Sequence, residues 1–135
     1  MFTSRPGRRA ACTGAVALSA AVVLLGAAAP ASAKSGDVVK RAACSGASVT
    51  KLKLSAEGSR IETELEVDSN RTGQRWSVGL YRNGTKVAST TAVTRAPSGS
   101  FSVRRLVSNG AGRETVKGLA TNSSTGEVCR VTARF

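Results

Sequence analysis

The sequence contains no histidine, and its three cysteines form no Cys-x-x-Cys pair. Without an imidazole, a serine or cysteine nucleophile lacks its commonest general base, and zinc sites built on histidine or four cysteines are excluded. No Gly-x-Ser-x-Gly motif is present, and Gly110-Ala-Gly112 lacks the Gly-Lys that completes a phosphate-binding loop. These absences predict a protein that is not an enzyme and that needs no metal or other cofactor.

Aromatic residues are also scarce, at 4% of the chain. Proteins that bind single-stranded nucleic acid stack bases on exposed aromatic side chains. Beyond residue 33 the only aromatic residues are Trp76, Tyr81, Phe101 and Phe135, and we expect Trp76 and Phe101 to lie in the core. Specific nucleic-acid binding is therefore not expected.

One apolar run stands out, at residues 15–29. It follows a basic start with Arg5, Arg8 and Arg9, and it precedes the small residues Pro30-Ala31-Ser32-Ala33. This order is typical of a secretory signal peptide, and the run is short for a membrane span, which needs about 20 apolar residues. We expect cleavage after Ala33, by the Sec route or the twin-arginine route, and a protein that is secreted or associated with the cell wall and does not span the membrane.

Removal of residues 1–33 would leave 102 residues, the length of one domain. That part keeps 17 of the 20 Lys and Arg and all 8 acidic residues, a net charge of +9. It also keeps two cysteines, Cys44 and Cys129, and an even pair in an exported chain favours a disulfide. A loop of this length gives roughly 4 kcal/mol of stabilisation in the chain-entropy model.

Residues 34–43 are polar and without periodicity, so we expect a flexible leader before a β domain at residues 44–135. The clearest strand is Arg60–Asp68, where apolar residues and Thr63 alternate with three glutamates, Glu62, Glu64 and Glu66. Strand side chains alternate between the two faces, which predicts one buried face and one carboxylate-bearing face. A hairpin with the preceding segment would set Lys51 and Lys53 opposite those glutamates.

Short Val-, Leu- and Thr-rich segments continue to the end of the chain, separated by turn residues. Asn83-Gly84 is the strongest hairpin signal, because both residues tolerate the positive φ of a type I′ turn. The seven predicted strands include Lys51–Leu54, Arg60–Asp68, Gln74–Arg82, Thr85–Thr94, one that opens at Phe101, Glu114–Asn122 and Glu127–Arg134. This spacing predicts an all-β, antiparallel immunoglobulin-like or fibronectin-like sandwich, with a small barrel as the rival.

Trp76 on the third strand resembles the buried tryptophan of immunoglobulin-like domains, and Leu119–Asn122 before Gly126 is similar to their last hairpin. Their usual inter-sheet disulfide is absent; Cys44 precedes the first predicted strand and Cys129 lies in the last, so the bridge would join neighbouring terminal strands. From Cys44 to Cys129 the chain also resembles small exported actinobacterial proteins of unassigned function, in the strings Lys51–Leu54, Val67–Asn70, Gly73–Trp76, Pro97–Phe101 and Thr125–Cys129. None of these strings is catalytic, so the resemblance implies no site.

Positive charge is the one collective feature that predicts a function. Glutamates two apart on a solvated strand point in parallel, so the row at residues 62–66 suits neither a cation site nor paired catalytic acids. If the last three strands share one sheet, six basic residues could form a single patch: Arg104, Arg105, Arg113, Lys117, Arg130 and Arg134. Such a patch would bind an acidic protein surface or a polyanion such as teichoic acid, anionic lipid headgroups or extracellular DNA. The alternative is that the charge serves solubility alone.

A second hypothesis is inhibition of an extracellular protease. Arg95–Ser98 lies in a predicted turn, and its arginine could fill an acidic specificity pocket. An inhibitory loop needs local bracing, because a rigid loop loses little entropy on binding. With either function, we expect a monomer.

Overall fold

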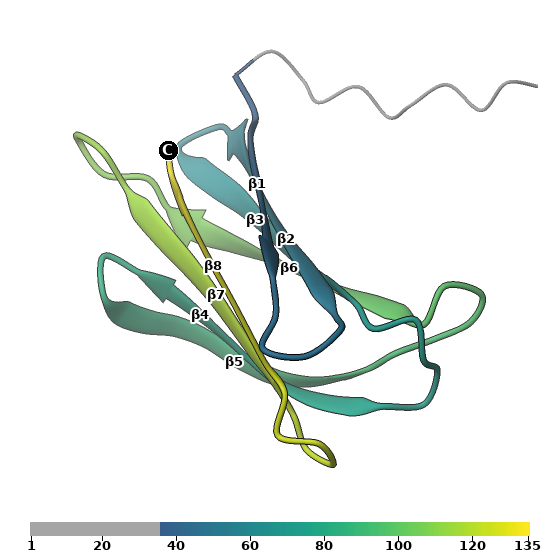
Figure 1. The fold of residues 1–135 in the computed structure, drawn as a ribbon. Coiled ribbons are helices and arrows are strands. Elements are labelled where there is room, and N and C mark those ends of the chain that lie inside the picture. The colour runs from purple at the N-terminus through teal and green to yellow at the C-terminus, as the bar shows by residue number, and fades with distance from the viewer. Residues whose placement is uncertain (1–35) are drawn as a thin grey trace, which may run out of the picture. The chain divides into compact units, whose positions relative to one another are not determined.

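Two antiparallel β-sheets pack face to face, as Figure 1 shows. The computed structural model describes residues 36–135, so the predicted signal peptide lies outside the described residues. Residues 36–135 form strands and turns without a helix, so no helix in this range could cross a membrane. The strands are β1 Val38–Ala43, β2 Val49–Glu57, β3 Arg60–Asp68, β4 Arg75–Arg82, β5 Thr85–Val93, β6 Ser100–Ser108, β7 Thr115–Asn122 and β8 Val128–Arg134.

The strand order confirms the predicted sandwich. The first sheet has the order β1-β2-β3-β6, and the second has the order β5-β4-β7-β8. Strands β2 to β8 follow the immunoglobulin-like pattern: hairpin β2–β3 lies in the first sheet, hairpins β4–β5 and β7–β8 lie in the second, and β6 returns to pair with β3. Strand β1 is an additional edge strand beside β2.

The β2–β3 hairpin has the predicted register. Lys51 is opposite Glu66, and Lys53 is opposite Glu64. The apolar side of β3 is buried and its glutamate side is partly exposed, as the period-two pattern requires. The predicted type I′ turn is also present, because Asn83 and Gly84 both have positive φ, 47° and 83°.

Side chains from both sheets form one core. Trp76 of β4 is fully buried and lies against Phe101 of β6, with ring centroids 6.1 Å apart. Leu65 of the first sheet packs on the backbone of Gly118 in the second, where a Cβ atom would overlap the leucine side chain. This contact brings β3 and β7 together. Because Gly118 faces the core, its neighbours Lys117 and Leu119 point away from the core.

The expected flexible leader is wrong for its second half. Residues Val38–Ala43 form β1 and pair with Val49–Leu54 of β2. The segment lacks alternation because it is an edge strand whose two faces are both largely exposed, so the pattern of half-buried strands does not apply. Consequently Cys44 follows the first strand instead of preceding it.

The predicted disulfide between Cys44 and Cys129 is present. It joins the end of β1 to β8, the edge strand of the other sheet. Two hydrogen bonds accompany it: Ser45 N–H donates to the Val128 carbonyl at 2.8 Å, and Val128 N–H donates to Ser45 Oγ at 2.9 Å. One side of the sandwich is thereby closed, and such a bond is compatible with an extracellular protein.

Candidate functional site: the basic face of the second sheet

The six basic residues that the sequence groups together divide between the two sheets and one loop. Lys117 lies on β7, and Arg130 and Arg134 lie on β8, all in the second sheet. Arg104 and Arg105 lie on β6, which is the edge of the first sheet. Arg113 lies in the loop between β6 and β7. The premise that the last three strands share a sheet is therefore wrong.

The outward side of the second sheet has two further basic residues outside the predicted patch, Arg75 on β4 and Lys86 on β5. Both side chains point outward. Arg75 comes directly before the buried Trp76 on β4, and Lys86 is opposite the outward-pointing Tyr81, next to a local register shift. The alternation of Arg75 with Trp76 is visible in the sequence, but the neighbours of β4 are not. We call the outward residues Arg75, Lys86, Lys117, Arg130 and Arg134 the basic face.

The strand registers set Lys86, Lys117 and Arg130 close together. Arg75 and Arg134 lie toward opposite ends of the same sheet face. Tyr81 is opposite Lys86 on one side and opposite Lys117 on the other, and Arg130 is opposite Leu119, two residues along β7. Adjacent strands are about 4.8 Å apart, so the four strands span about 14 Å. The basic face is thus wide enough to contact several charges of one polymer.

Tyr81 holds two of the cations. The Nζ atom of Lys117 lies 4.4 Å from the centre of its ring, and Nζ of Lys86 lies 5.6 Å from it. Both are within the distance at which an ammonium group is attracted to an aromatic ring. The ring lies along β4 over Gly79, where a Cβ atom would approach Tyr81 Cε2 to 3.1 Å. The ring therefore restrains both lysines before any ligand binds.

A shallow hollow of about 130 Å³ lies beside this ring. It is lined by small hydroxyl side chains of β4, β5 and β7 together with Lys86 and Leu119. Hydroxyl donors next to ammonium groups suit phosphate or sulfate oxygens, which accept hydrogen bonds in several directions. The hollow is small, so it can hold a single anionic group and no larger organic ligand.

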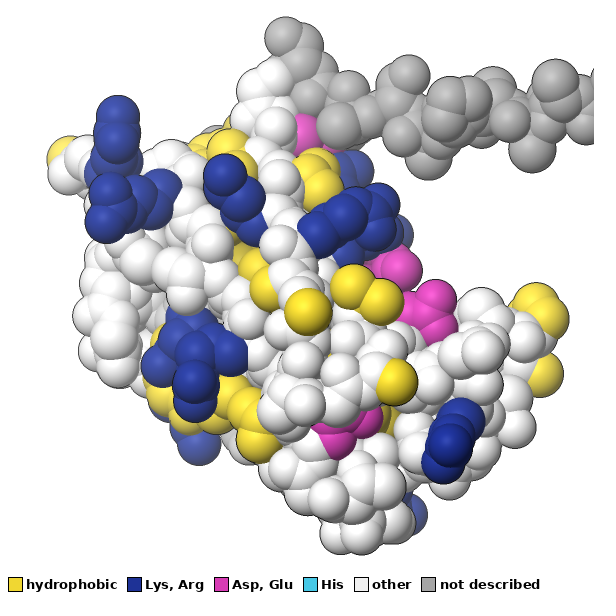
Figure 2. All heavy atoms as spheres, in the orientation of Figure 1, with side chains coloured by type: hydrophobic (Ala, Val, Ile, Leu, Met, Phe, Trp, Pro, Cys, Tyr) yellow, Lys and Arg dark blue, Asp and Glu magenta, His cyan; other side chains and the backbone are white. Residues whose placement is uncertain are grey.

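No acidic side chain competes on this face, because the four strands of the second sheet contain no Asp or Glu. The glutamates of β3 lie on the outward side of the other sheet, where Glu66 pairs with Lys51 and Glu64 pairs with Arg104 at 3.3 Å. Partial burial raises the pKa of Glu64, but the Ser102 hydroxyl and Arg104 outweigh it and lower that pKa overall. Among residues 36–135 no group of potential ligands is suited to a metal ion. On the left side of the view in Figure 2, basic side chains are present without acidic ones.

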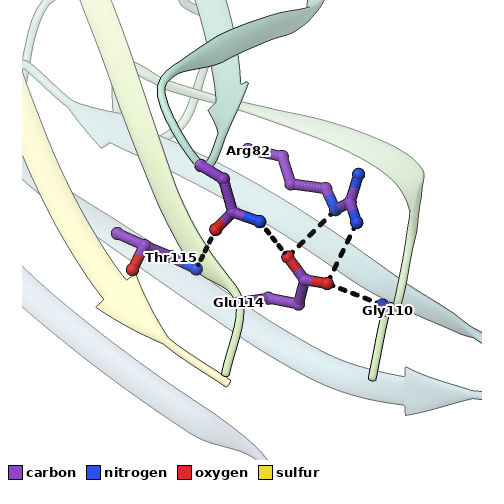
Figure 3. Close-up of polar contacts among 5 residues, drawn as sticks. Arg82, Gly110, Glu114 and Thr115 are labelled. Atoms are coloured by element: carbon purple, nitrogen blue, oxygen red, sulfur yellow. Dashed lines mark hydrogen bonds and ion pairs between the residues drawn. The ribbon is translucent and has the colours of Figure 1, made fainter. Parts of the chain in front are cut away.

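The carboxylate of Glu114 is buried at the entry to β7 and fixes one end of the second sheet (Figure 3). Arg82 donates to both of its oxygens, from Nε at 3.1 Å and from a terminal nitrogen at 3.0 Å. The Gly110 N–H donates at 2.6 Å, and the Asn83 amide donates as well. Arg82 first, then Gly110 and Asn83, lower the pKa of Glu114. These bonds hold the β4–β5 turn against β7, and Tyr81 and Lys86 flank that turn.

The loop of the inhibitor hypothesis, Arg95–Ser98, closes on itself. Arg95 N–H donates to the Ser100 carbonyl at 2.9 Å, and the Arg95 carbonyl accepts from Gly99 N–H at 2.9 Å. A protease binds a loop in an extended conformation by pairing with its backbone, and here the backbone at Arg95 is already paired within the loop. Its geometry therefore gives no support to inhibition.

No protein-family model matches the chain, and no curated protein shows significant similarity to it.

Proposed function

We propose that this protein is a non-enzymatic binding module for an anionic polymer, which it holds on the basic face. The observation that supports the proposal is charge segregation: five outward Lys and Arg share one sheet whose strands contain no acidic residue. Charge needed only for solubility works best with both signs interspersed, as on the first sheet. Focused charge of one sign instead attracts polyanions.

We further propose that the protein acts outside the cell, at the envelope. The apolar run and the small residues before Ala33 support export, and the disulfide is compatible with an oxidising compartment. Gram-positive envelopes present phosphate-rich polymers, whose charge complements the basic face. Such a polymer is our preferred ligand, ahead of an acidic protein surface, because a flexible chain can follow cations spread from one end of the sheet to the other.

The test is co-sedimentation with purified Gram-positive envelope, before and after acid extraction of its teichoic acid. The double variant Lys117→Glu/Arg130→Glu reverses two charges of the basic face. The matched control Arg41→Glu/Arg60→Glu makes the same change in net charge at exposed positions of the first sheet. Circular dichroism of all three proteins verifies that each is folded.

We expect the basic-face variant to bind about tenfold more weakly or worse at low salt, while the control stays near the original affinity. Extraction of the teichoic acid should abolish binding of the unaltered protein. Equal losses in the two variants would mean that net charge alone governs binding and would refute the site. Absence of binding at low salt would refute the function.

A further inference from the structure

The side of the sandwich opposite the disulfide is open. There β6 is the edge of the first sheet and β5 is the edge of the second, and each pairs with one neighbour only. A groove of about 410 Å³ lies between the two edges. Its lining combines β5, β6 and the loop that joins them, and it includes Ala92, Arg95, Phe101, Val103, Arg104 and Arg105.

The outer edge of β6 has backbone groups that no strand satisfies. The Arg104 carbonyl accepts a hydrogen bond of 2.7 Å from the exposed side chain of Arg105, its own neighbour. A side chain can leave such a bond at little cost, because water replaces it. This edge therefore offers backbone hydrogen bonds to an added strand, which is the mode of recognition known as strand addition.

Charge restricts what can pair there. Three arginines line the groove, Arg95, Arg104 and Arg105, and no acidic residue does. Arginines on an exposed edge strand keep it from pairing with a second copy, because like charges would be brought opposite each other. The same arginines favour a partner strand that has carboxylates. Phe101 and Val103, each 7% exposed, give the groove an apolar floor.

The other edge of β6, which pairs with β3, shows what sequence pattern suits a neighbouring strand. There β3 sets Glu64 opposite Arg104, with an ion pair of 3.3 Å, and Leu65 opposite Val103. The β3 sequence alternates acidic and apolar residues, so that carboxylates meet arginine on the outer face and apolar side chains enter the core. A strand added on the free edge meets the same two sets of β6 side chains, with Arg104 on the outer face and Val103 on the core side.

We infer that the free edge of β6 is a second binding site, which takes an extended segment of a partner protein that alternates acidic and small apolar residues. The carboxylates would lie beside Arg104 on the outer face. The apolar side chains would enter the groove over Val103, toward Ala92 of β5. This site is separate from the basic face and does not depend on the function proposed for it.

The test is an NMR titration that follows the backbone amides of the isotope-labelled protein. The protein is obtained by expression of the full chain, and the peptide Thr-Glu-Val-Glu-Val-Glu-Thr is added in increasing amounts. One control peptide replaces each Glu by Lys. A second keeps every side chain but is N-methylated at its five central residues, so that it cannot donate backbone hydrogen bonds. The variant Arg105→Glu alters the groove, and Arg130→Glu makes the same charge change on the basic face.

We expect saturable shifts of the amides of residues 101–106 with the first peptide and none with either control. Arg105→Glu should weaken binding about tenfold or more, and Arg130→Glu should leave it nearly unchanged. Equal binding of the N-methylated peptide would refute strand addition, and equal binding of the lysine peptide would refute the acidic partner. Shifts confined to the second sheet, or no binding, would refute the site.

Discussion

Glu114 links parts of the chain that are far apart in sequence. Its carboxylate accepts hydrogen bonds from β4, the β4–β5 turn and the β6–β7 loop. Its backbone pairs with Phe135 at the C-terminus, through bonds of 2.8 and 3.1 Å. Hydrogen bonds from this many donors favour the ionised form of a buried carboxylate, and they lower the pKa of Glu114. The end of the second sheet is thus sensitive to the protonation of one residue.

The variant Glu114→Gln tests this at the residue scale. The pKa of Glu114 in the folded protein is below its ordinary value of 4.5, so the unfolded chain binds the proton more tightly. The stabilisation is fully present above pH 4.5 and is lost as the pH falls through the lowered pKa of the folded state. We expect the variant to melt at a lower temperature at pH 7, and the difference from the unaltered protein to shrink below pH 4.

Thermal melts followed by circular dichroism from pH 7 to pH 2.5 measure that difference. Glu64, whose pKa is also lowered, is present in both proteins, so its contribution cancels. Glu57→Gln, at an exposed position near the β2–β3 turn, is the control and should change little. A difference in Tm that is the same at every pH would contradict the prediction.

At the scale of elements, the disulfide decides how firmly β1 is held. β1 is an edge strand whose inward residues Val38 and Ala42 are only partly buried against the core. Beyond that packing and its pairing with β2, it is held by Cys44. The bond connects residues 85 positions apart, so it restricts most of the unfolded chain. Removal of both sulfurs by Cys44→Ser/Cys129→Ser is expected to lower the free energy of unfolding by about 2–5 kcal/mol.

Urea unfolding of the oxidised protein, the reduced protein and the double serine variant provides the measurement. The reduced protein and the variant should unfold at similar, lower urea concentrations. Unchanged midpoints would show that native pairing alone holds β1, in contradiction to this prediction.

The sequence predicts elements well where one face of a strand is buried. The alternation at Arg60–Asp68 and the Asn83-Gly84 turn are both found as expected, because burial and positive φ impose local residue preferences. β1 was missed because an exposed edge strand imposes no such preference. Its pairing depends on β2 and on a cysteine that bonds 85 residues away.

At the scale of the whole molecule, the net charge matters less than its distribution. Charges of both signs are interspersed on the first sheet, with ion pairs at Lys51–Glu66 and Arg104–Glu64, whereas the five cations of the basic face share their surface with no carboxylate. For a flexible polyanion, each neutralised phosphate adds about −0.7 to the slope of log K against log salt. The predicted slope with a single-stranded phosphate polymer is therefore about −3.5.

A salt series by fluorescence anisotropy with labelled polyphosphate measures this slope. Lys117→Glu/Arg130→Glu should reduce it to about −2, and Arg41→Glu/Arg60→Glu should leave it near −3.5. A slope near zero in the unaltered protein would contradict a multivalent basic face.

The sequence by itself determines an antiparallel all-β domain, the disulfide pair and the inward or outward direction of residues on half-buried strands. These follow from local chemistry: period-two burial, turn residues with positive φ, and two cysteines in one chain. The two-sheet strand order decides for a sandwich over a barrel. The grouping of charges was decided only by tertiary structure. Whether Arg104 joins Lys117 or lies on the opposite sheet depends on which strands become neighbours, and that is fixed by the packing of both sheets around Trp76.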